Sequence, residues 1–113
     1  MIGLGTFPLT GDVLSTTIKD AVDLGYELFD TATGYDNEQE LGELVGKGVL
    51  DPKKVFITSK IHSSVLLGRK RYLYLNRKSV KRAYKESCEK LQTQKIGAYL
   101  LPKSKRGKYV FGY

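Results

Sequence analysis

The sequence predicts an α/β fold in which four parallel strands alternate with helices, as in half of an eight-fold β/α barrel. Short apolar runs alternate along the chain with longer stretches of helical periodicity. Each interval between apolar runs is long enough for a helix, and such crossover connections join parallel strands. With 113 residues the chain is about half as long as the ~250 residues of a closed barrel. We therefore expect about four β/α units.

The first half of the chain contains two expected strands and two expected helices. Residues 1–7 are an apolar run with two glycines, which predicts a buried strand. Residues 12–24 have apolar positions at helical spacing, and Gly25 follows as a C-terminal cap. A second strand is expected over residues 26–30. A second helix is expected over residues 36–45, where acidic side chains in the first turn favour the helix dipole.

The second half contains the remaining units. Residues 54–59 are continuously apolar and β-branched, which predicts a strand covered on both faces. Residues 77–92 place small and apolar side chains, including Cys88, on one helical face, and residues 96–101 form a fourth apolar strand. We expect a single domain, 1–113, composed of the first units in 1–61, an irregular basic segment at 62–76, a helix and strand in 77–101, and a tail at 102–113. The segment 62–76 is either a long loop or a short amphipathic insertion.

Composition indicates a soluble globular protein. Hydrophobic residues make up 41% of the chain and charged residues 27%. One cysteine excludes an intramolecular disulfide, and no secretory leader is apparent. No apolar run approaches the ~20 residues that cross a bilayer, so we expect a cytoplasmic protein without membrane contact. His62 is the only histidine and lacks partners at ligand spacing, so we expect no metal site.

Charge is divided unevenly along the chain. Residues 1–52 contain ten acidic and two basic residues, whereas residues 53–113 contain seventeen basic and two acidic residues. The basic half could bind nucleic acid, or it could contact the acidic half of a second copy. The simpler explanation is that lysines and arginines solvate exposed helix faces. Tyrosines lie among the bases, as in single-strand binders, but no nucleic-acid-binding motif accompanies them, and we rank nucleic acid low.

Residues capable of chemistry follow three of the predicted strands. Thr6 follows the first strand, Asp30 and Tyr35 the second, and Lys60 the third. In a β/α barrel the active site lies at the carboxyl ends of the strands. A phenol can act as a general acid near neutral pH only if a nearby cation stabilises its anion. Lys60 could be that cation, and Asp30 could hold Lys60 through a salt bridge.

The segments that carry these residues resemble the amino-terminal half of an aldo-keto reductase. They are Gly3-Leu-Gly-Thr-Phe7, Phe29-Asp-Thr-Ala32 with Tyr35 and Asn37-Glu38, Phe56-Ile-Thr-Ser-Lys60, and residues 79–91 leading into 96–101. The resemblance covers nearly the whole chain apart from residues 62–76 and the tail. Three patterns follow one another: Asp-Thr-Ala-x-x-Tyr, Asn-Glu, and a strand ending in Thr-x-Lys. Their combination is fairly specific.

The resemblance implies a (β/α)8 barrel and NADPH-dependent reduction of a small carbonyl substrate. In that reaction a nicotinamide hydride reduces the carbonyl while a tyrosine donates the proton. By match, Tyr35 resembles the proton donor, Lys60 the lysine that supports it, and Asp30 the partner of the lysine. The resemblance places Gly5, Thr6 and Asp30 beside the nicotinamide, and Phe7 in the substrate pocket.

The sequence also departs from the family pattern. Pro102 stands where the fourth strand of the family normally ends in a histidine that orients the carbonyl. The second half of the family's barrel, with most of the cofactor contacts, has no counterpart. We therefore expect a truncated or degenerate reductase with weak or no activity alone. The alternative is a non-enzymatic basic domain that binds an acidic partner or nucleic acid.

The expected half-barrel has open edges at its first and fourth strands, and such edges need pairing or covering. Two copies could pair edge to edge into an eight-stranded assembly. The basic segments 62–76 and 103–113 could instead cover the edges. We expect a homo-oligomer.

Overall fold

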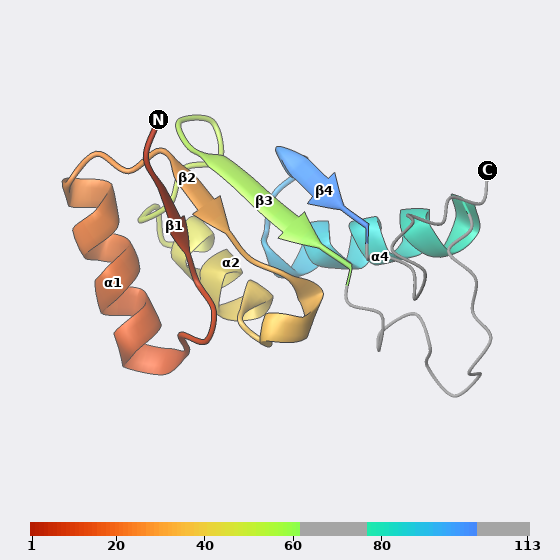
Figure 1. The fold of residues 1–113 in the computed structure, drawn as a ribbon, viewed down its shortest axis with the longest axis horizontal. Helices are drawn as coiled ribbons and strands as arrows, with labels where there is room; N and C mark the ends of the chain where they lie inside the picture. Colours follow the sequence, from red (N-terminus) through yellow and green to blue (C-terminus); the bar gives the residue numbers. More distant parts are fainter. Residues whose placement is uncertain (62–76, 102–113) are drawn as a thin grey trace, which may run out of the picture.

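The computed structural model describes residues 1–61 and 77–101, which form a parallel sheet with helices packed against it (Figure 1). Each strand pairs with the next strand in the sequence, in the order β1-β2-β3-β4. The elements are β1 (Gly3–Gly5), α1 (Gly11–Asp23), β2 (Leu28–Asp30), the 3-10 helix η1 (Thr33–Tyr35), α2 (Glu38–Gly46), β3 (Phe56–Lys60), α4 (Arg77–Lys90) and β4 (Ala98–Leu100). This arrangement confirms the predicted parallel β/α half-barrel. The predictions for residues 62–76 and 102–113, including His62 and Pro102, lie outside the described residues.

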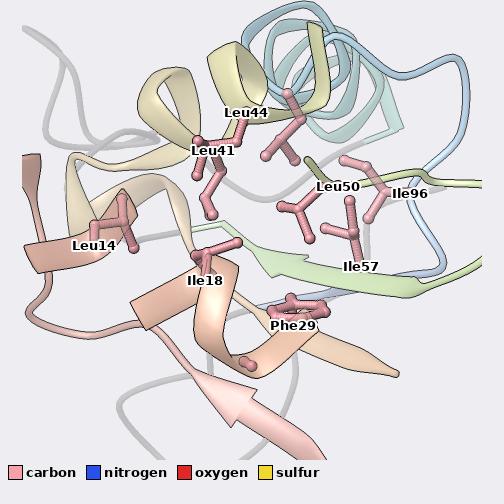
Figure 2. Packing of buried hydrophobic residues seen from close by; sticks show 10 residues of the cluster. Leu14, Ile18, Phe29, Leu41, Leu44, Leu50, Ile57 and Ile96 are labelled. Carbon is pink, nitrogen blue, oxygen red and sulfur yellow. The ribbon is translucent and has the colours of Figure 1, made fainter. Parts of the chain in front are cut away.

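The hydrophobic core lies between the sheet and the helices (Figure 2). Leu14 and Ile18 of α1 are one helical turn apart, so both point at the sheet and are fully buried. Helix α1 ends as its sequence predicts, because Gly25 follows it with φ +87° and donates its N–H to the carbonyl of Val22. The other labelled core residues are Phe29, Leu41, Leu44, Leu50, Ile57 and Ile96.

Helix α4 presents the face that its sequence predicts. Ser79, Ala83 and Ser87 recur every four residues and are buried, while Cys88 packs at the margin of the core. The lysines and arginines of the helix are exposed. None of the helices in the described part of the chain is long and apolar enough to cross a membrane.

Two strands are less buried than their sequences predict. In β3, Ile57 and Ser59 are buried, but Phe56 is 41% exposed. In β1, Gly3 and Gly5 are exposed. The predictions of a doubly covered third strand and a buried first strand were therefore wrong. The physical reason is that the helices cover one face of the sheet, and no described element covers the other.

Candidate active site

An ion pair joins the carboxyl ends of β2 and β3. Asp30 is the last residue of β2 and pairs in register with Thr58 of β3. Lys60 lies two residues beyond Thr58, so its side chain emerges on the same, open face of the sheet. The Nζ of Lys60 lies 2.8 Å from Oδ2 of Asp30. Parallel pairing thus brings together two predicted residues that are thirty positions apart in sequence.

Two further groups fix this ion pair. The hydroxyl of Thr58 donates to Oδ1 of Asp30 at 2.6 Å, so both carboxylate oxygens accept a hydrogen bond. Lys60 Nζ also donates to the carbonyl of Thr31 at 3.1 Å. We predicted no role for Thr58 from the sequence. The spacing Thr58-x-Lys60 could have identified it, because alternate residues of a strand share one face.

Tyr35 lies against the lysine, and Phe7 lies against Tyr35. Lys60 Nζ lies 4.8 Å from the centroid of the Tyr35 ring, within the range of a cation–π contact. The Phe7 ring packs against the same ring at a centroid distance of 5.0 Å and an angle of 50°. Tyr35 is the last residue of the short helix η1, which we did not predict from the sequence.

The surroundings keep Lys60 protonated. Partial burial by itself lowers the pKa of Lys60, but side-chain hydrogen bonds with Asp30 and then Tyr35, together with their charges, raise that pKa above 10.5 overall. The ammonium form therefore persists at neutral pH. A fixed cation beside a phenol can stabilise a phenolate, which is the requirement for a tyrosine to give up a proton.

The predicted cofactor residues Gly5 and Thr6 differ in exposure. A Cβ added at Gly5 would meet nothing within 4 Å, so the backbone there borders open space. Thr6 is fully buried. Its hydroxyl donates to the carbonyl of Asp30 at 2.8 Å, and its N–H donates to the same oxygen at 3.0 Å. Thr6 therefore supports the end of β2 from inside and presents no side-chain surface to a ligand.

Asn37 is a second residue whose contribution our sequence analysis missed. We predicted that it begins the second helix, and it does precede α2 at the N-cap position. Its side chain makes no capping hydrogen bond. It turns instead toward Thr6, Leu9 and Thr31 around the candidate site. No group of three His, Cys, Asp or Glu side chains that could hold a metal occurs among the described residues.

Fold and geometry together define a class of protein. Parallel β/α units with a phenol, an ammonium group and a carboxylate at the carboxyl ends of the strands are those of a β/α-barrel protein, whose active site lies at that end. The chain belongs to the aldo/keto reductase family, whose family model matches residues 1–105.

Individual relatives agree with this membership. Methylglyoxal reductase DkgB of Salmonella typhi is 33% identical over 99 residues, which cover 88% of this chain and 34% of that protein. A crystal structure of a putative 2,5-diketo-D-gluconic acid reductase B matches with a TM-score of 0.73 and 29% identity, over 92% of this chain and 34% of that one. An aldo-keto reductase crystallised with NADPH matches with a TM-score of 0.67 and 25% identity, over 88% of this chain and 31% of that one. The chain spans about a third of the length of these relatives.

Proposed function

We propose that this chain is an NADPH-dependent carbonyl reductase in which Tyr35 donates a proton to the oxygen of a small aldehyde or ketone. The observation that carries the proposal is the position of Lys60, whose ammonium group lies between the Asp30 carboxylate and the Tyr35 ring. Family membership supports it, since a relative is named for the reduction of methylglyoxal and another was crystallised with NADPH. When bound, the nicotinamide supplies the hydride that reduces the carbonyl carbon.

The side chains have distinct parts in this proton transfer. The Tyr35 hydroxyl donates its proton as negative charge develops on the carbonyl oxygen. Lys60 stabilises the phenolate that remains. Asp30 acts through Lys60, because it holds the ammonium group at 2.8 Å. Phe7 is 65% exposed and packs on Tyr35, so it is placed to line the approach of a substrate.

The described residues fit the nicotinamide end of the cofactor. Gly5 pairs in register with Asp30, and the space that a Cβ would fill at Gly5 is empty. A flat ring can therefore approach the backbone closely there. The side chain of Asp30, 30% exposed, borders the same space. Thr6 would contribute indirectly, by holding the carbonyl of Asp30.

We further propose that the 113-residue chain is a weak catalyst alone. Asp30 and Lys60 are 30% and 29% exposed, so water reaches the ion pair. Water weakens the electrostatic stabilisation of developing charge, which is strongest in a site that excludes solvent. The alternative of a non-enzymatic basic binding domain gains no support from the comparisons. Solvation accounts for the exposed bases of α4.

The test is NADPH oxidation by the purified chain with a nitrobenzaldehyde as substrate. We expect slow turnover that falls by about 100-fold or more in Tyr35→Phe, because general acid catalysis contributes roughly 10²–10⁴-fold. Tyr26→Phe is the matched control, since Tyr26 packs against the hydrophobic core, and its turnover should equal that of the wild type. Equal turnover by wild type and Tyr35→Phe contradicts the role of Tyr35. A wild-type chain that neither turns over nor binds NADPH contradicts the whole proposal.

A further inference from the structure

The side chain of Asn37 is fully buried among three segments of the candidate site. Its Nδ2 donates to Oγ1 of Thr6 at 3.0 Å, and it also contacts the carbonyl oxygens of Leu9 at 3.1 Å and Thr6 at 3.3 Å. Its Oδ1 accepts a hydrogen bond from the hydroxyl of Thr31. One amide therefore connects the loop after β1, the residue after β2 and the start of α2.

The loop after β1 carries Phe7. Thr6 precedes Phe7 and Leu9 lies two residues after it. The N–H of Leu9 donates to the carbonyl of Thr6 at 2.7 Å, so the loop turns tightly. Since Phe7 is 65% exposed, burial alone does not fix its ring against Tyr35. The backbone on either side of Phe7 must do so. Asn37 bonds to that backbone on both sides.

The same amide is linked to the groups that hold Lys60. Thr31 donates its hydroxyl to Asn37 and accepts a hydrogen bond from Lys60 Nζ on its carbonyl. Thr6, on the opposite side of the amide, donates to the carbonyl of Asp30. Asn37 thus bonds directly to Thr31 and is linked to Asp30 through Thr6.

The chemistry of this position requires an amide. Nδ2 donates to oxygen atoms, while Oδ1 accepts from a hydroxyl. An aspartate has nearly the same shape, but when ionised it can only accept. It would face the carbonyl oxygens of Thr6 and Leu9 without a proton to share, and buried polar groups left unpaired are costly. The usual role of Asn before a helix is capping, and Asn37 makes no such bond.

We propose that Asn37 is a positioning residue of the reductase site. It holds Phe7 against Tyr35 through the loop after β1. It also holds Thr31, whose carbonyl accepts a hydrogen bond from Lys60. Because it is fully buried, it does not touch substrate. The catalytic meaning of this role rests on the proposed function, whereas the placement of the two rings can be measured without any turnover.

The test records the NOE between the ring protons of Phe7 and Tyr35, with unfolding curves and kcat and KM for the same variants. In Asn37→Asp, at a temperature where the chain is folded, we expect loss of this NOE and a fall in kcat of about 10-fold or more, because small misplacements are costly to catalysis. Ser87→Ala is the control. It removes a hydrogen bond between the hydroxyl of buried Ser87 and the hydroxyl of Tyr99, and should lose stability with the NOE intact.

If Asn37→Asp does not fold, Thr31→Val replaces it. This variant keeps the carbonyl that Lys60 uses but deletes the hydroxyl that bonds Asn37, and it should weaken the NOE. If Asn37→Asp folds and keeps the wild-type NOE, the proposal is overturned. If Asn37→Asp does not fold, the same result in folded Thr31→Val overturns it. Absence of turnover in every variant, including the wild type, counts against the proposed function, while the NOE still decides the role of Asn37.

Discussion

Lys60 carries the only ion pair found among the described residues, and it lies at the centre of the candidate site. Asp30, Tyr35 and the carbonyl of Thr31 surround its ammonium group from three segments of the chain. Partial burial lowers the pKa of Lys60, but Asp30 and Tyr35 favour the charged form more strongly and raise that pKa overall. The raised pKa of Lys60 therefore depends on the folded site, and its effect on stability can be measured.

Asp30→Asn should reduce the loss of stability at alkaline pH. Because the folded-state pKa of Lys60 lies above the unfolded value of 10.5, its contribution to stability is present below pH 10.5 and is lost as the pH rises through the folded-state pKa. Without the Asp30 charge the two pKa values lie closer together. We expect the free energy of unfolding, measured in urea, to fall less for Asp30→Asn than for wild type between neutral pH and about pH 11.

The control for this prediction is Asp36→Asn. Asp36 is exposed, and its left-handed backbone, with φ 57°, also suits asparagine. The free energy of unfolding of Asp36→Asn should depend on pH in the same way as that of the wild type. If Asp30→Asn and wild type lose equal stability at alkaline pH, Asp30 does not raise the pKa of Lys60.

At the scale of elements, Gly42 of α2 marks a close contact with α4. A Cβ added there would lie 1.8 Å from the carbonyl oxygen of Lys90 at the end of α4. Gly42 therefore allows the backbones of the two helices to touch. This approach brings Leu91 of the α4 end into the core, where it is fully buried.

Gly42→Ala should destabilise the native state by about 1–3 kcal/mol, the usual cost of overpacking. Alanine is better than glycine inside a helix by about 1 kcal/mol, but the backbone carbonyl that it meets cannot move aside cheaply. Gly46→Ala is the matched control in the same helix, because its Cβ would meet the flexible end of Gln92 at 2.6 Å. Urea unfolding should show a loss for Gly42→Ala and little change for Gly46→Ala. Equal stabilities would mean that the helices can separate without cost.

At the scale of the whole molecule, the described residues cover only one face of the sheet. Leu28 and Phe56 lie on the uncovered side, where a Cβ on Gly3 would meet Leu28 at 2.7 Å and a Cβ on Gly97 would meet Phe56 at 2.8 Å. These side chains therefore lie flat across neighbouring strands. Among the described residues, β1 and β4 have no outer neighbour. A sheet with open edges tends to pair with another chain.

We expect the 113-residue chain to self-associate at micromolar concentration. The first half of the chain is acidic and α4 is basic, and opposite charges favour contact between copies. Leu100 in β4 is 52% exposed, so Leu100→Lys should shift sedimentation toward the monomer. Leu24→Lys is the control, because Leu24 is 77% exposed and lies in neither edge strand. A wild-type chain that sediments as a stable monomer contradicts this expectation.

The sequence by itself determined the order of strands and helices and their parallel arrangement, and it indicated that Asp30, Tyr35 and Lys60 meet at the strand ends. These features follow from local information. The apolar spacing of residues 12–24 reports a helix, and an acid, a phenol and a lysine after successive strands must meet where parallel strands end. Boundaries were also close, because Gly25 and the acidic first turn of α2 act on adjacent residues.

The tertiary structure alone decided which face of each strand is covered and what holds the site together. An apolar run such as residues 54–59 shows that side chains can be buried, but it does not show which neighbours bury them. Likewise, Thr6 looks available in the sequence, yet it is buried because its hydroxyl bonds to a strand twenty-four residues away. The bonds of Asn37 span up to thirty-one positions. Such contacts depend on strand register and loop path, and local residue patterns contain neither.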